Sequence, residues 1–190
     1  IVFDVGGIYD SKTLRFDHHQ KGGAGERENG IPYSSFGLIW KEYSAVLCGG
    51  AEVAQIVDER LVQCVDGPDN GVGDINMSNG YYPYGLQDII SAERPTWQEN
   101  IDIRQSFDIA VGLAKEILTR AIVQTKSFLT AKEKLQERYD ATENKSVVDI
   151  NIDYPGWYTF MAEHPEVLYV VYASESGGWT IRATRKDPLK

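Results

Sequence analysis

Cysteine and long apolar runs are both scarce in this chain of 190 residues. The two cysteines, Cys48 and Cys64, do not suggest a disulfide scaffold, and we expect small buried thiols in a reducing compartment. No apolar run approaches the roughly 18–20 residues that a membrane helix needs, and no secretory signal pattern is present. The sequence therefore predicts an intracellular globular protein without a membrane span, with enough residues for a buried core.

Basic residues are also few. The chain has 19 Lys and Arg against 28 Asp and Glu, which gives a formal net charge of −9 and a pI near 4.8. A protein that coats nucleic acid needs a basic surface, so the charge disfavours that class. A cluster of metal-binding acids would account for part of the charge, and a bound metal ion reverses the potential around it. A phosphate-containing substrate is therefore still compatible with this composition.

Histidine is rare as well, yet two of the three histidines are adjacent, in Asp17-His18-His19. Paired histidines beside a carboxylate are costly to bury, so a neutral packing role rarely produces them. A neutral imidazole next to an ionised carboxylate is instead a natural pair of ligands for a divalent metal ion. This segment is the strongest functional signal in the chain.

Two other segments carry acids in a similar context. Asp4 ends an apolar run and precedes two glycines, while Asp66 and Asp69 lie in the turn-rich sequence VDGPDNG. Carboxylate and imidazole ligands without thiolate suit Mn²⁺, Mg²⁺, Fe²⁺ or Co²⁺ better than a structural zinc ion. Taken singly, each acid is equally compatible with a turn or a helix cap. Together, the three segments predict a metal site built from several loops.

The hydrophobic pattern predicts an α/β fold. A polar, glycine-rich loop is expected over residues 20–30, and a long irregular stretch over residues 66–85. Apolar residues recur every three or four positions from 103 to 139, which predicts one bent helix or two consecutive helices. The other predicted helices begin after Ser34-Ser35 and cover residues 51–65 and 86–92; the predicted strands cover residues 1–5, 13–16, 149–153, 168–173 and 179–184, with a hairpin at Gly177-Gly178.

The first two predicted strands place the candidate ligands together. Ligands usually bind at the carboxyl ends of strands in an open α/β sheet, so Asp4 and Asp17 are expected to emerge side by side. Ser34 and Ser35 follow soon after, at a helix start. They could offer a hydroxyl and backbone N–H groups to a phosphate, although plain N-capping is the simpler role.

The ordered set of motifs resembles the DHH phosphoesterase superfamily, which includes RecJ-type exonucleases, oligoribonucleases and family II pyrophosphatases. Within it, the chain is most similar to the Myg family, the melanocyte proliferating gene proteins. The resemblance rests on three motifs: DVGGIYD at residues 4–10, RFDHHQ at 15–20 and VDGPDNG at 65–71. RENGIPYSSFGLIW, YPYGLQDII, RPTW and GGWTIRATRKDP extend the resemblance across most of the chain.

The resemblance implies a role for each candidate residue. Asp4 would bridge two metal ions, Asp17 and His18 would be ligands, and His19 would contact the scissile phosphate or orient a ligand. In a catalytic role, Asp17 and His19 are the expected pair, and Ser35 is a further candidate for the substrate phosphate. One aspartate of VDGPDNG should complete the site; Asp69 is favoured because DNG resembles the DTG of some relatives, and Asp66 is a close second.

The resemblance also implies an organisation. A DHH-type domain over residues 1–100, with a mainly parallel sheet flanked by helices, would be followed by a helical connector over 101–145 and the start of a C-terminal α/β domain over 146–190. A first metal motif of the form HNGxFHxDD is expected before residue 1, and a further motif with His and glycine after residue 190. We therefore expect weak or no metal binding and little activity from these residues alone.

The function implied is a metal-dependent phosphoesterase that uses two divalent ions, Mn²⁺ or else Mg²⁺, to activate water. The better-studied relatives resemble 3′–5′ exonucleases, so RNA or short oligonucleotides are the expected substrates. The alternatives are a phosphatase or pyrophosphatase for a small phosphoester, and a non-catalytic metal-binding regulator. An intracellular location is expected, cytoplasmic in a bacterium and mitochondrial or nuclear in a eukaryote, and the sequence leaves the oligomeric state open.

Overall fold

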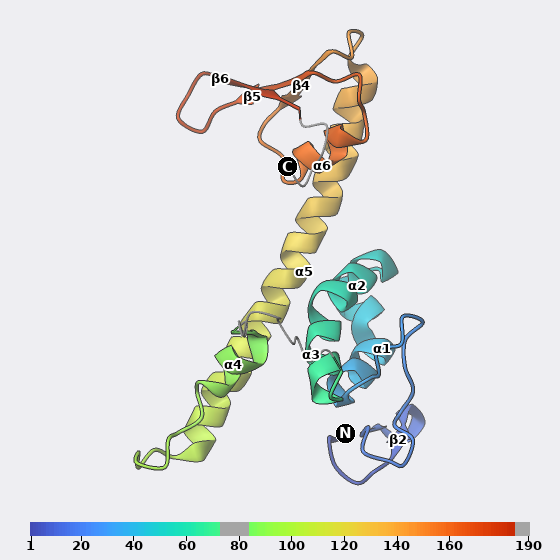
Figure 1. Ribbon diagram of the computed structural model, residues 1–190, viewed down its shortest axis with the longest axis vertical. Helices are drawn as coiled ribbons and strands as arrows, with labels where there is room; N and C mark the ends of the chain where they lie inside the picture. The colour runs from blue at the N-terminus through green and yellow to red at the C-terminus, as the bar shows by residue number, and fades with distance from the viewer. Residues whose placement is uncertain (73–83, 185–190) are drawn as a thin grey trace, which may run out of the picture. The chain divides into compact units, whose positions relative to one another are not determined.

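The computed structural model describes residues 1–72 and 84–184 (Figure 1). The chain divides into two compact units, Ile1–Val123 and Gln124–Lys190, and the long helix α5 runs across the division. The fold is α/β, as the sequence predicted. The predicted boundaries at residues 100 and 145 remain predictions, and each unit is described by itself below.

A small three-stranded sheet begins the first unit. It comprises β1 (Val2–Phe3), β2 (Tyr9–Asp10) and β3 (Arg15–Phe16) in the order β1-β3-β2, with a short 3-10 turn, η1 (Ser11–Thr13), between β2 and β3. β1 is parallel to β3, whereas β2 is antiparallel to β3. The strands are shorter than predicted, because Asp4 and Leu14 both adopt left-handed backbone angles that end regular pairing.

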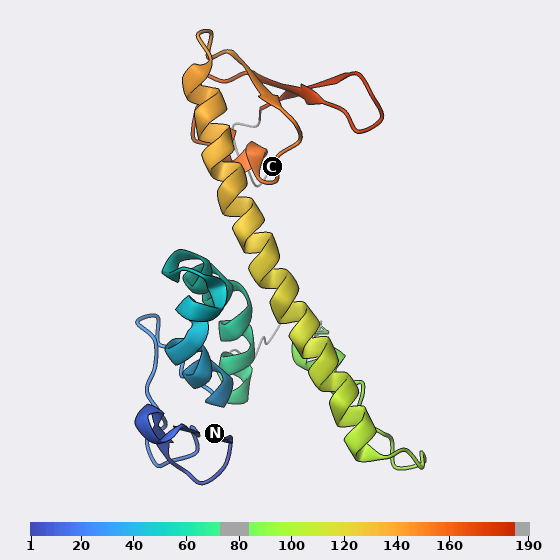
Figure 2. The same ribbon diagram turned by 180° about the vertical axis from the view of Figure 1, so that it is seen from behind.

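Helices form the rest of the core of this unit. Ser34 caps α1 (Ser35–Cys48), accepting a hydrogen bond from Phe36 N–H, and Gly49 ends it in the left-handed conformation. The helix predicted over residues 51–65 is instead α2 (Ala51–Val57), a π-helical turn η2 (Asp58–Val62) and α3 (Gln63–Asp69) in direct succession. α2 and α3 follow one another end to end and pack alongside α1 in both ribbon views (Figures 1 and 2).

Apolar side chains hold these helices together. A buried cluster joins residues of α1, α2 and η2, and three residues of α5 pack against it. Full burial of one such side chain contributes about 1.5–3 kcal/mol. The buried members are Trp40, Cys48, Ala54, Val57 and Val62, and the α5 residues are Leu118, Ala121 and Ile122.

The helical pattern after residue 100 belongs to a single helix. α5 (Ile103–Ala141) is continuous over 39 residues, which decides between the two predicted forms. At 1.5 Å per residue its length is about 58 Å. It follows α4 (Leu86–Ser91), which ends before Pro95, as the sequence predicted.

The second unit is a β-α-β unit followed by a hairpin strand. β4 (Val147–Asn151) is parallel to β5 (Tyr169–Ala173), with α6 (Trp157–Ala162) between them, and β6 (Trp179–Ala183) returns antiparallel to β5. The hairpin turns at Gly177-Gly178, both with positive φ, as predicted. No helix was predicted over the residues of α6. The buried core comprises Leu135, Val148, Ile150, Phe160, Met161, Val167, Val170 and Tyr172.

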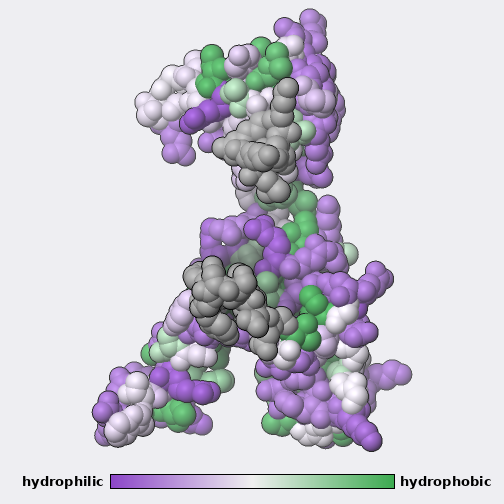
Figure 3. All heavy atoms as spheres, viewed as in Figure 1, coloured by the Kyte–Doolittle hydropathy of each residue, from purple (hydrophilic) through white to green (hydrophobic). Residues whose placement is uncertain are grey.

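Parallel pairing is limited to one pair of strands in each sheet, so the sheets are less parallel than predicted. Hydrophilic side chains cover most of the face shown in Figure 3. Within residues 1–72 and 84–184, no helix combines the length and the apolar character needed to cross a membrane.

Candidate metal centre

The ends of two parallel strands bring the first candidate ligands together. Phe3 pairs with Phe16, so Asp4 and Asp17 each follow the last paired residue of their strand. Asp4 N–H donates to the Phe16 carbonyl at 3.0 Å, which ties the two strand ends together. Asp4 has φ of 58°, a conformation that aspartate tolerates better than most residues. The two carboxylates therefore leave the same edge of the sheet.

Asp17 is buried, with 1% of its surface exposed, and accepts three hydrogen bonds. One carboxylate oxygen accepts Gly7 N–H at 2.6 Å, and the other accepts His19 N–H at 3.1 Å and His19 Nδ1 at 2.6 Å. Burial alone would raise the pKa of Asp17, but the bonds from Gly7 and His19 outweigh it and lower the pKa to about 2. Asp17 is thus a permanent anion at neutral pH.

His19 is oriented by this anion. Its Nδ1 donates to Asp17, and its side chain is 60% exposed. The bond to Asp17 raises the pKa of His19, burial opposes the shift, and the charges of Asp17, Asp4 and Asp69 add to the increase. The ring of His19 also lies against that of His18, with centroids 4.2 Å apart. An oriented, proton-bearing imidazole results.

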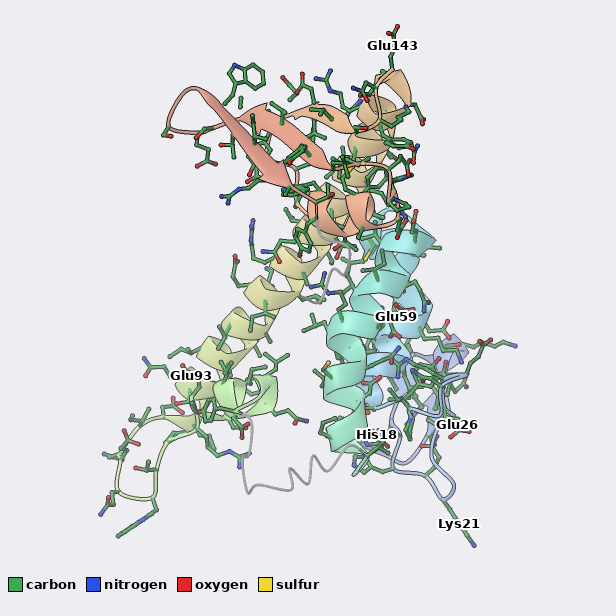
Figure 4. All side chains as sticks on the ribbon, turned by 45° about the horizontal axis from the view of Figure 1, so that its top comes forward. His18, Lys21, Glu26, Glu59, Glu93 and Glu143 are labelled. Atoms are coloured by element: carbon green, nitrogen blue, oxygen red, sulfur yellow. The ribbon has the colours of Figure 1, made fainter. Side chains whose placement is uncertain are left out.

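His18 faces the start of α1 on one side and the end of α3 on the other. Ser35 N–H donates to His18 Nδ1 at 3.2 Å, and Ser35 Oγ, 3.1 Å from the same nitrogen, donates to Asp4 Oδ1 at 2.9 Å. Because Nδ1 accepts a hydrogen bond, the hydrogen-bond network assigns the ring proton to Nε2. Nε2 lies 3.3 Å from Asp69 Oδ2. Figure 4 labels His18 beside the C-terminal end of α3.

The resulting group of side chains could hold a metal ion. Asp4, Asp17, His18 and His19 each offer one ligand atom, and these atoms all lie within 4.8 Å of one another. Asp69 lies at the margin of this group, in contact with His18. The donors are all carboxylate oxygen or imidazole nitrogen, a set that fits hard or borderline divalent cations. The residues present therefore fit such an ion.

Asp66 lies apart from this group, although it was predicted in the same segment as Asp69. It belongs to α3 rather than to the predicted irregular stretch, and it is completely buried. Burial raises the pKa of Asp66 despite its hydrogen bonds, which act in the opposite direction. Those bonds come from Ser34 Oγ at 2.6 Å, Arg27 Nη2 at 2.7 Å and Gly37 N–H at 3.1 Å.

Ser34 and Ser35 have different roles, since Ser34 caps α1 and Ser35 hydrogen-bonds to His18 and Asp4. Ser34 is the N-cap of α1, as the simpler interpretation predicted. Both donors of Ser35 are engaged inside the site, its N–H with His18 and its hydroxyl with Asp4. A role of Ser35 toward a substrate phosphate remains a prediction.

Sequence reasoning missed the residues that surround Asp66. Arg27 Nε and Nη2 donate to the two carboxylate oxygens of Asp58 at 2.8 and 2.7 Å, and the guanidinium lies 4.3 Å from the centre of the Tyr33 ring. Gly37 leaves room for Asp66, since a Cβ on Gly37 would lie 1.8 Å from Asp66 Oδ2. An arginine in a polar loop and a glycine inside a helix were the available signals, and neither is specific.

Several known proteins of similar sequence carry the name MYG1. The MYG1 exonuclease of Mus musculus is 29% identical over 223 aligned positions, which cover 99% of this chain and 58% of the mouse protein. The MYG1 exonuclease of Homo sapiens is 29% identical over 224 positions, covering 99% of this chain and 59% of the human protein. The MYG1 protein of Dictyostelium discoideum is 26% identical over 213 positions, covering 96% and 64%. No solved structure matches the chain.

The chain spans less than two thirds of the length of these relatives. A family model with the description "Uncharacterised protein family (UPF0160)" matches residues 1–190, the whole of the chain. Because the match leaves out no residue, the chain belongs to this family, the MYG1 proteins.

Proposed function

We propose that this chain supplies part of the metal centre of a DHH-type phosphodiesterase, which acts as a 3′–5′ exonuclease on RNA or short oligonucleotides. The observation that carries the proposal is the convergence of Asp4, Asp17, His18 and His19 at one strand edge, with ligand atoms within 4.8 Å of one another. The name exonuclease, given to the mouse and human relatives, supports a nucleic acid as the substrate.

Three side chains are best placed to hold divalent ions, two Mn²⁺ or Mg²⁺ in the complete protein. Asp4 is half-exposed, and His18 Nε2 faces Asp69, which is also half-exposed. His18 would bind an ion through Nε2 with its ring proton on Nδ1, where Ser35 Oγ at 3.1 Å can accept it. Asp17 accepts three hydrogen bonds from the protein and keeps one of its four lone-pair positions for an ion. When bound, divalent ions in such sites lower the pKa of water and neutralise charge on a phosphoryl group.

His19 and Ser35 contribute without contacting an ion. Asp17 holds Nδ1 of His19, so the exposed side of the imidazole is available to donate a proton or a hydrogen bond to a phosphate oxygen. The raised pKa of His19 favours the protonated, cationic form that this role requires. Ser35 hydrogen-bonds to both Asp4 and His18, which holds these two ligands in a constant position relative to one another.

The test uses the protein extended to the length of its relatives, because the chain covers 58% of the mouse protein. A 5′-labelled single-stranded RNA is incubated with Mn²⁺, and the products are resolved by length. The comparison is between His18→Ala and His164→Ala, since His164 lies in the second unit, against Tyr139. Stepwise shortening from the 3′ end that His18→Ala abolishes and His164→Ala retains is the expected result.

Other outcomes would redirect or refute the proposal. Mn²⁺ binding by calorimetry without RNA cleavage would refute the exonuclease and favour the phosphatase or pyrophosphatase. Equal activity of His18→Ala and the parent would refute a catalytic metal centre at this position. Metal binding with no hydrolysis of RNA, pyrophosphate or a nucleoside monophosphate would favour the non-catalytic regulator.

A further inference from the structure

We propose that Asp66 and Arg27 form a positioning clamp for the metal centre, which fixes the first turn of α1 and through it the orientation of His18 and Asp4. The inference rests on the proposed function in one respect, namely that His18 and Asp4 act as metal ligands. It gives Asp66 a role other than that of a ligand, although Asp66 and Asp69 are only one helical turn apart.

The first step is the contact between Asp66 and α1. Asp66 Oδ1 accepts Ser34 Oγ at 2.6 Å and Gly37 N–H at 3.1 Å. Ser34 is the N-cap and Gly37 the third residue of α1, so the carboxylate binds both ends of the first turn. Its negative charge also lies where the unpaired N–H groups of a helix favour an anion.

The second step leads from this turn to the metal ligands. Ser35 lies between the two clamped residues, and its N–H and hydroxyl donate to His18 Nδ1 and Asp4 Oδ1 at 3.2 and 2.9 Å. A shift of the turn would therefore move both donors at once. Without a metal ion, the Ser35 N–H bond assigns the ring proton of His18 to Nε2. An ion at Nε2 would require that proton to move to Nδ1, where Ser35 Oγ, 3.1 Å away, can accept it.

The third step is the anchoring of the carboxylate itself. Arg27 Nη2 donates to Asp66 Oδ2 at 2.7 Å, and Arg27 also forms a two-point ion pair with Asp58. The Arg27 side chain is 7% exposed and that of Asp66 is 0% exposed, so neither charge is screened by solvent. A buried ion pair of this geometry is rigid, and its loss leaves an uncompensated charge. Asp66 is thus held from behind while it holds α1.

The matched variants are Asp66→Asn and Asp58→Asn. Both remove one charge opposite Arg27, but of the two carboxylates only Asp66 accepts hydrogen bonds from Ser34 and Gly37 at the start of α1. The readout in the metal-free protein is the pair of ¹⁵N shifts of the His18 ring, compared with the parent at one fixed pH, because the difference between the two shifts reports the tautomer. The second readout is Mn²⁺ affinity by calorimetry, and circular dichroism reports folding.

We expect Asp66→Asn to bring the Nδ1 and Nε2 shifts of His18 together and to weaken Mn²⁺ binding by roughly 10–100-fold, as loss of a supporting hydrogen bond does at other metal sites. Asp58→Asn should leave both readouts unchanged. If Asp66→Asn does not fold, Ser34→Ala removes the hydroxyl link to Asp66 and should produce the same convergence of shifts.

Unchanged His18 shifts in folded Asp66→Asn or Ser34→Ala would overturn the clamp, and so would equal effects of Asp58→Asn. The failure of the proposed function looks different. A parent protein that shows the single His18 tautomer but binds no Mn²⁺ would refute the metal centre alone, because the shifts are measured without metal.

Discussion

The close contact between Gly37 and Asp66 predicts that Gly37→Ala destabilises the fold, whereas the same substitution at Gly112, another helical glycine, stabilises it. In Gly37→Ala the new methyl carbon would lie 1.8 Å from Asp66 Oδ2 and 2.6 Å from its Cγ. The carboxylate would have to move by about 1.6 Å to reach an ordinary contact distance of about 3.4 Å. It cannot do so freely, because Arg27 and Ser34 hold it at hydrogen-bond distances of 2.7 and 2.6 Å.

The magnitude follows from the bonds that would weaken. Hydrogen bonds to charged groups contribute about 1.5–3 kcal/mol each, and overpacking of a core costs typically about 1–3 kcal/mol. Alanine in a helix recovers up to about 1 kcal/mol relative to glycine. We therefore expect Gly37→Ala to lower the free energy of unfolding by roughly 2–4 kcal/mol. It should also weaken Mn²⁺ binding.

The matched control is Gly112→Ala. Gly112 is an exposed residue of α5, and a Cβ there meets nothing within 4 Å. The same substitution should raise the free energy of unfolding by up to about 1 kcal/mol. Urea unfolding followed by circular dichroism measures both variants. A Gly37→Ala protein as stable as its parent, or two variants that shift in the same direction, would refute the assigned packing of Asp66 against α1.

Three further predictions concern pH, backbone conformation and metal. The native pKa of Asp17, about 2, is below its ordinary value of 3.8. Asp17 therefore stabilises the fold above about pH 4, and this contribution is lost as the pH falls toward 2. The free energy of unfolding in urea, measured between these pH values, should vary less with pH in Asp17→Asn than in the parent. Gly177→Ala, at positive φ in open space, should cost about 1–2 kcal/mol, while Gly156→Ala, whose Cβ would lie 2.4 Å from an aromatic ring, should lower the melting temperature more. Mn²⁺ at about 100 times its Kd should raise the melting temperature by roughly 5–10 °C, and His18→Ala should abolish the rise.

Local sequence patterns made part of the fold predictable. The helix predicted from residue 103 begins at Ile103, and the hairpin predicted at Gly177-Gly178 is present. Both signals are local: apolar residues recur with the helical period in one case, and glycine permits a tight turn in the other. Such elements need little information from distant residues.

Other elements could not be read from local sequence. The strand predicted over residues 1–5 ends at Phe3, because Asp4 takes a left-handed conformation next to Asp17. The sequence VDGPDNG has the composition of a loop, yet α3 extends through it to Asp69. Pro68 lies in the last turn of that helix, and the buried bonds of Asp66 to Arg27 and α1 hold the segment in a helical form that composition disfavours.

The sequence by itself determined the chemistry of the candidate centre and its membership of a family. Carboxylates and paired imidazoles without thiolate define the class of ion, and their order along the chain carries the resemblance. Only the tertiary structure separated the two aspartates of one motif, placing Asp69 beside His18 and Asp66 against Arg27. The physical reason is that spacing fixes which helical turn a residue occupies, whereas burial and charge partners depend on what packs against that turn.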